Sequence, residues 1–183
     1  MSDPSENFKT RKIYGRVFLT SKIHLVLMII IFAIALIVGI AKATSANGSS
    51  TDLQIGVFFQ WFAIIFIPSS AILMSMVNIV PGVREGFSEA LGRTPSAVYQ
   101  IDESFFMLAM AIGTIVAYTK FTYSAEFCVA LVFSIFGILS GSSRIFEFYN
   151  GNNSLDNISL MFWDLIPSLT MIVTGSIGSG SFS

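Results

Sequence analysis

Long apolar stretches separated by short polar ones dominate the chain. A helix needs about 20 mainly apolar residues to cross a bilayer. Five stretches reach this length, at residues 23–41, 55–80, 96–118, 125–145 and 158–177. Asp164 and Pro167 interrupt the fifth, so four spans are the alternative. The pattern predicts an all-α polytopic transmembrane bundle, a single domain over residues 23–178 with a flexible Gly/Ser-rich tail at 179–183.

Residues 1–22 form a basic leader that contains five of the ten Lys and Arg residues. Its apolar residues recur at helical spacing opposite its basic ones: Ile13, Tyr14, Val17 and Phe18 against Lys9, Lys12 and Arg16. This predicts an amphipathic segment that lies on an anionic leaflet before turning into the first span. A topogenic tail with no further role is the alternative. Ala41-Lys42-Ala43 also resembles a signal-peptide cleavage site, although the basic leader is long for such a peptide.

The distribution of basic residues predicts the orientation. With the N-terminus in the cytoplasm, the inner side carries the five leader residues, Arg84, Arg93 and Arg144, and the outer side carries Lys42 and Lys120. Eight basic residues on the inner side against two on the outer side predict a multi-pass cell-membrane protein with a cytoplasmic N-terminus. Five spans then place the C-terminus outside. Between the second and third spans, Val83, Phe87 and Leu91 predict a short interfacial helix, and Thr94-Pro95 predicts the start of the next helix.

The composition excludes several classes of protein. Only 11% of residues are charged, against about 25% in a soluble domain, and a net charge of −1 gives no reason to expect nucleic acid. One cysteine and one histidine permit no internal disulfide, zinc site or iron–sulfur cluster, so we expect no cofactor. Cys128 is interpreted as a buried thiol and His24 as an interfacial imidazole.

Polar residues from four of the spans are predicted to meet in the inner third of the membrane. These are Asn78, Asp102, Glu103, Arg144, Glu147 and Asp164. Adjacent helical residues point about 100° apart, so one of Asp102 and Glu103 faces the bundle and the other reaches the interface. Arg144 and Asp164 are predicted neighbours, with hydrogen bonds from Ser140, Ser142 or Ser143. Either a structural ion pair or a proton- or ion-handling site fits this cluster.

Small residues predict where the helices approach closely. Gly137 and Gly141 form a GxxxG motif in the fourth span, and Gly113 lies in a similar small-residue repeat in the third. Gln60, Trp61 and Trp163 are interpreted as interfacial belt residues.

Two segments, "PSAVYQID" and "FWDLIPSLTMIV", resemble an uncharacterised prokaryotic family of polytopic membrane proteins with a domain of unknown function. The resemblance covers residues 92–174, with Tyr99, Gln100 and Asp102 matching one motif and Asp164 and Ile166-Pro167 the other. Where that family is expected to have a histidine late in the fourth span, this chain has Ser143 or Arg144. The resemblance implies architecture and no activity.

Three functions follow from these observations. The leading hypothesis is a non-catalytic subunit or assembly partner of a larger membrane complex, with the lipid bilayer and other membrane subunits as its partners. The alternative is a small proton- or ion-coupled transporter that uses the carboxylate and arginine cluster. The third is a membrane enzyme acting on a lipid or quinone, which the lack of a nucleophile–base pair or phosphate loop disfavours.

Overall fold

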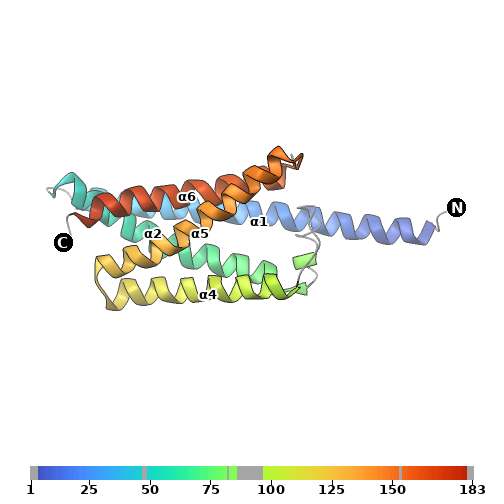
Figure 1. Ribbon diagram of the computed structural model, residues 1–183, viewed down its shortest axis with the longest axis horizontal. Helices are drawn as coiled ribbons and strands as arrows, with labels where there is room; N and C mark the ends of the chain where they lie inside the picture. Colours follow the sequence, from blue (N-terminus) through green and yellow to red (C-terminus); the bar gives the residue numbers. More distant parts are fainter. Residues whose placement is uncertain (1–3, 47–48, 82, 86–96, 153, 181–183) are drawn as a thin grey trace.

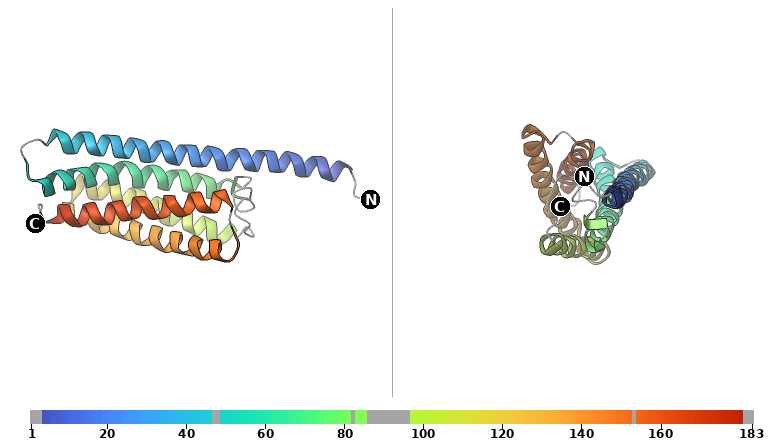
Figure 2. Two further views of the ribbon diagram at one scale, coloured as in Figure 1. Left: turned by 90° about the horizontal axis from the view of Figure 1, so that it is seen from above. Right: turned by 90° about the vertical axis from the view of Figure 1, so that its right-hand side faces the viewer.

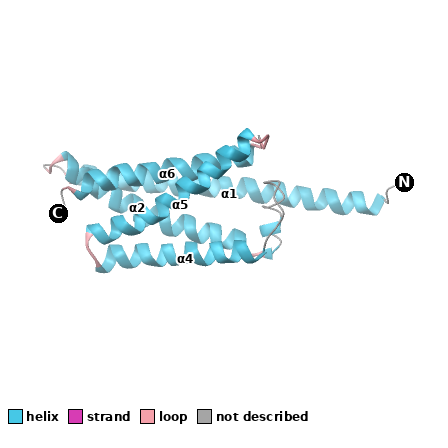
Figure 3. Cartoon of the chain, in the orientation of Figure 1, coloured by secondary structure: helices cyan, strands magenta, loops and turns pink. Residues whose placement is uncertain are grey.

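A computed structural model of the chain describes residues 4–46, 49–81, 83–85, 97–152 and 154–180. Its five long helices are α1 (Pro4–Ser45), α2 (Thr51–Ile79), α4 (Ala97–Lys120), α5 (Tyr123–Tyr149) and α6 (Leu155–Ser179). All five contain a segment long and apolar enough to cross a membrane, which confirms the predicted all-α polytopic bundle of five spans. Figure 3 shows no strand within the described residues. The predicted interfacial helix at 83–91 and the Thr94-Pro95 start lie mostly or wholly outside them.

The helices run along one common direction, with α2 in contact with each of the other four (Figures 1 and 2). The N-terminal part of α1 extends from one end of the bundle, which we call the leader end. The end of α2, the start of α4 and the α5–α6 turn also lie at the leader end (Figure 1). The distal end carries the α1–α2 and α4–α5 connections. The N-terminal end of α1 and the C-terminal end of α6 lie at opposite ends, as an odd number of crossings requires.

Aromatic side chains fill the centre of the bundle. Phe59, Phe62 and Phe66 recur at helical spacing on one face of α2 and are at most 2% exposed. Phe32 of α1 meets Phe62 edge-on with ring centroids 5.8 Å apart, and Phe66 meets Phe133 of α5 in the same way at 6.4 Å. These edge-to-face contacts connect α1, α2 and α5 through one apolar core.

Serine side chains cap the start of α2 and of α6, and a proline lies within each of these two helices. Ser50 and Ser154 accept hydrogen bonds from Leu53 N and Asn157 N, which begins α2 and α6 with ordinary N-caps. Pro68 and Pro167 lie within α2 and α6, and both are buried.

The leader does not turn where it was predicted to. α1 is one helix of 42 residues, and its N-terminal part continues past the other helices along the axis of the first span (Figures 1 and 2). No proline or glycine lies between Arg16 and Val38, so nothing in the sequence interrupts the helix at residue 22.

One single-residue prediction is wrong: Cys128, predicted to be a buried thiol, is exposed on α5. His24, near the start of the first span, is 4% exposed and packs within the bundle. Both lie in apolar stretches, and hydropathy alone does not distinguish the face of a helix that meets lipid from the face that meets another helix.

Candidate functional site

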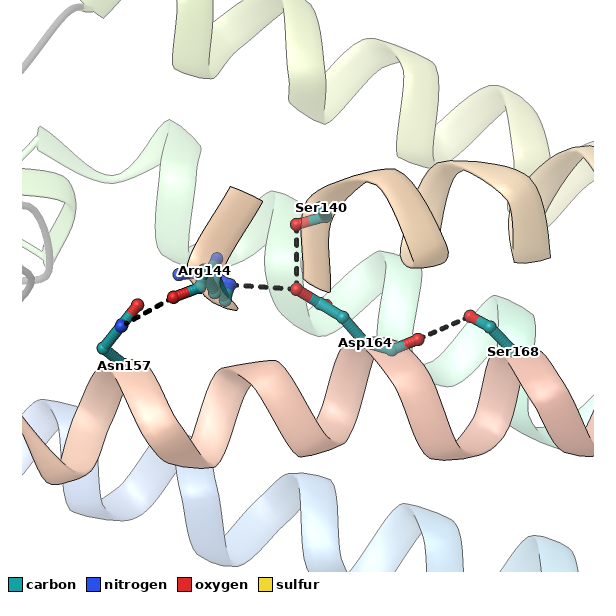
Figure 4. Close-up of polar contacts among 5 residues, drawn as sticks. All are labelled: Ser140, Arg144, Asn157, Asp164 and Ser168. Carbon is teal, nitrogen blue, oxygen red and sulfur yellow. Dashed lines mark hydrogen bonds and ion pairs between the residues drawn. The ribbon is translucent and has the colours of Figure 1, made fainter. Parts of the chain in front are cut away.

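An ion pair between α5 and α6 is the centre of the candidate site (Figure 4). The Nε of Arg144 donates to Oδ2 of Asp164 at 2.9 Å. The hydroxyl of Ser140 donates to the same oxygen at 2.8 Å. Ser140 and Arg144 are four residues apart and therefore lie on the same face of α5. One turn of α5 thus supplies both donors to a single carboxylate oxygen.

The two glycines of the GxxxG motif allow α6 to come this close. A Cβ atom on Gly137 would lie 2.9 Å from the main-chain oxygen of Asp164, and one on Gly141 would lie 2.7 Å from Cγ of Leu165. Gly113, in contrast, has only Val129 Cγ1 nearby, at 3.7 Å from such an atom. Close approach at Gly137 and Gly141 therefore sets the distance between Asp164 and α5.

Hydrogen bonds also fix the main chain on each side of the ion pair. Asn157 donates from Nδ2 to the carbonyl of Arg144 at 3.2 Å, and Ser168 donates to the carbonyl of Asp164 at 2.6 Å (Figure 4). On α2, the hydroxyl of Ser75 donates to the carbonyl of Ser104 at 3.1 Å, which holds α4 against α2 beside Glu103. The site is therefore built on α2, α4, α5 and α6 together.

A cavity of about 50 Å³ adjoins the ion pair. Its polar lining comprises Ser70, Glu103, Ser140, Arg144, Asp164 and Ser168, and aromatic and methionine side chains form most of the rest. A single water needs roughly 10–15 Å³ measured in this way, so several waters or a small hydrated ion fit. Pockets for drug-sized ligands are much larger, at about 300–1,000 Å³.

Arg144 is buried, with a side chain 8% exposed, yet its Nη1 has no hydrogen-bond partner among the described residues. Buried guanidinium nitrogens are normally paired, because an unpaired donor loses its hydration without replacement. A water or another acceptor in the cavity is the simplest partner for Nη1.

The structure divides the predicted polar cluster. Arg144, Asp164 and Glu103 line the cavity, and Asp102 is exposed on the other side of α4, since adjacent residues diverge by about 100°. Asn78 is 3% exposed at the same end but does not line the cavity, and Glu147 lies one turn beyond Arg144, partly exposed. From the predicted cluster, the cavity lining therefore contains Glu103, Arg144 and Asp164, and Asn78, Asp102 and Glu147 lie outside that lining.

The structure also places one of the predicted belt residues and the three serines. Trp163 lines the cavity and meets Phe32 edge-on with centroids 5.5 Å apart, so its ring packs within the bundle. Of the three serines, Ser140 bonds Asp164, and Ser142 and Ser143 are exposed.

Sequence reasoning missed Asn157 and Ser168. Asn157 lies seven residues before Asp164 and Ser168 four after it, so all three share one face of α6. A search for polar residues at helical spacing from Asp164 would have found both.

Comparison with known proteins finds no matching protein-family model, curated protein or solved structure. The resemblance of residues 92–174 to an uncharacterised membrane family therefore stays a prediction.

Proposed function

We propose that the protein is a small proton- or ion-coupled carrier that binds its cation or proton in the cavity beside Arg144 and Asp164. The observation that carries this proposal is a cavity of about 50 Å³ whose lining combines two acids, Glu103 and Asp164, with one base, Arg144. Ionisable groups inside membrane bundles are costly, and they commonly mark ion or proton pathways.

The formal charges of the lining favour a cation or proton over an anion. Glu103 and Asp164 are two acids against the single base Arg144, which gives a net charge of −1 when all three are ionised. Asp164 already accepts hydrogen bonds from Ser140 and Arg144, so Arg144 is its fixed counter-charge. Glu103 lines the same cavity from α4, so it is the second acid that a cation or proton bound there would lie beside.

Transport across liposomes tests the proposal. Purified protein is reconstituted with a pH-sensitive dye inside, and proton or alkali-cation flux is measured after an imposed gradient. We expect Glu103→Gln to abolish flux and Asp102→Asn, the exposed neighbour on the same helix, to retain it. Flux no greater than in protein-free liposomes, or equal flux in Glu103→Gln and wild type, would contradict a carrier role for the cavity.

A double variant separates transport from stability. Replacing a buried ion pair with apolar residues of similar volume often leaves a protein as stable as before. We therefore expect Arg144→Met/Asp164→Leu to remain folded in detergent and to lose flux. A folded double variant with wild-type flux would show that the ion pair serves only to join α5 to α6.

The second candidate is a subunit of a larger membrane complex, and α1 favours it. α1 packs mainly on α2, and its N-terminal part continues beyond the bundle (Figure 2). Native mass spectrometry in mild detergent tests this candidate. A fixed stoichiometry with a second protein, lost on deletion of residues 2–21, would support a subunit; the same single mass for both chains would oppose it.

A further inference from the structure

A second buried acid, Glu126, lies at the distal end of the bundle, away from the cavity. It is the fourth residue of α5, and it is 2% exposed. Its Oε2 accepts a hydrogen bond from Nε2 of Gln60 on α2 at 2.9 Å. Its Oε1 has no partner among the described residues. Because protein atoms alone bury this side chain, its isolation from water does not depend on where the bilayer lies.

No cation compensates Glu126 within the described part of the chain. Lys42, the basic residue of α1 at this end, has its Nζ 4.6 Å from the centroid of the Trp61 ring. The titratable groups near Glu126 are the phenols of Tyr118 on α4 and Tyr123 on α5. The Tyr123 hydroxyl donates to the carbonyl of Gly175 on α6 at 3.0 Å. α6 itself has no titratable residue after Asp164.

An ionised carboxylate in this place would be poorly stabilised. One amide donor replaces the several hydrogen bonds that water gives a carboxylate, and buried charges need pairing or fuller hydrogen bonding. The first turn of α5 favours negative charge through the helix dipole, but the main-chain N–H of Glu126 is already bonded to the carbonyl of Thr122. The neutral acid loses much less on burial, since it carries no net charge.

We propose that Glu126 and Gln60 form a proton-binding site, in which Glu126 is held as a neutral carboxylic acid at neutral pH. This site is separate from the cavity, because Phe62 and Ala63 follow Gln60 along α2 and lie in the apolar core before Phe66 and Ser70 reach the cavity. Glu126 and Arg144 are 18 residues apart on the buried face of α5, about 27 Å along the helix axis. The proposal stands whether or not the cavity transports an ion.

Infrared spectroscopy of the protein in lipid tests the protonation state directly. At neutral pH we expect the C=O stretch of a protonated carboxylic acid, shifted by ¹³C-labelled glutamate and lost in Glu126→Gln. Asp52→Asn, an exposed acid at the same end, and Glu103→Gln, the acid of the cavity, should leave that band in place. The ¹³C shift shows in the unaltered protein that the protonated acid is a glutamate, and the Glu126→Gln variant assigns the band to Glu126.

Labelling with a hydrophobic carbodiimide provides a second readout. The acid proton moves to a nitrogen of the reagent, the carboxyl oxygen adds to its central carbon, and an acyl shift gives a stable N-acylurea. Mass spectrometry of the peptide containing Glu126 should show this adduct, and the peptide containing Asp52 should not. Absence of this C=O stretch at neutral pH, or its persistence in a folded Glu126→Gln variant, would overturn the proposal. Neither measurement involves flux, so a failure of the carrier proposal is seen separately.

Discussion

Asn157 on α6 donates its side-chain amide to the main-chain carbonyl of Arg144 on α5, at 3.2 Å. The same amide donates to the carbonyl of Asn152 in the α5–α6 turn, also at 3.2 Å. Asn157 is fully buried. One side chain therefore joins the turn, the first part of α6 and the main chain of the arginine that binds Asp164.

Replacing Asn157 with alanine should destabilise the bundle. The change removes both donors and leaves two main-chain carbonyls without their partner, which costs about 1–3 kcal/mol. Thermal unfolding in detergent, followed by circular dichroism, measures the loss. Ser159→Ala is the control, since the Ser159 hydroxyl bonds only the carbonyl of Leu155 in its own helix. Equal midpoints for the two variants would show that the Asn157 contacts add nothing to stability.

Gly137→Ala should also lower stability, because the new Cβ would lie 2.9 Å from the main-chain oxygen of Asp164 and force α6 away from α5. Overpacking of this kind costs about 1–3 kcal/mol. Gly113→Ala adds the same methyl group where the nearest atom is 3.7 Å away, so we expect little change. The thermal unfolding midpoints of both variants test the difference. A larger loss of stability for Gly113→Ala than for Gly137→Ala would contradict the helix contacts described at these two glycines.

Arg144→Met alone should be more destabilising than the double variant Arg144→Met/Asp164→Leu. The single change leaves Asp164, which has a 25% exposed side chain, without its cation. Breaking a buried pair from one side costs up to about 3–5 kcal/mol, and partial exposure reduces this figure. Unfolding in detergent at matched protein concentration gives the comparison. If Arg144→Met is as stable as the double variant, water must hydrate the Asp164 carboxylate once its cation is removed.

Cysteine labelling tests the five crossings and the orientation. In a Cys128→Ser background, Ser45→Cys and Asn150→Cys each place one exposed thiol, at the distal and the leader end respectively. With intact cells, we expect a membrane-impermeant maleimide to label position 45 and to reach position 150 only after lysis. The reverse pattern would invert the orientation predicted from the basic residues, and labelling of both positions in intact cells would contradict an odd number of crossings between them.

Hydropathy predicted the spans well because each needs only length and apolar content. The observed helices begin and end within about four residues of the predicted stretches, the leader of α1 aside. Height along the bundle axis was also predictable, since counting residues along α5 and α6 places Arg144 beside Asp164, and the two form an ion pair. The rotation of each helix about its own axis could not be predicted from the sequence. Asp102 and Glu103 have the same depth, and only the packing of α4 on α2 through Ser75 and Ser104 decides which faces inward.

Glu126 shows the same limit at the other end of the bundle. It lies beside a short polar segment, and its position in the sequence suggests an exposed acid at a helix start. Its burial depends on Gln60 of α2, 66 positions earlier, and on the tyrosines around it. The one available signal was its spacing of 18 residues, five turns, from Arg144, which places both on one face of α5.

Pro167 gives α6 a preferred point of bending. Proline has no amide hydrogen, so the carbonyl of Trp163 lacks its usual partner one turn later. Asp164, which pairs with Arg144, therefore lies next to the turn of α6 from which proline removes a main-chain hydrogen bond, and Gly175, whose carbonyl accepts from Tyr123, lies on the other side of that turn.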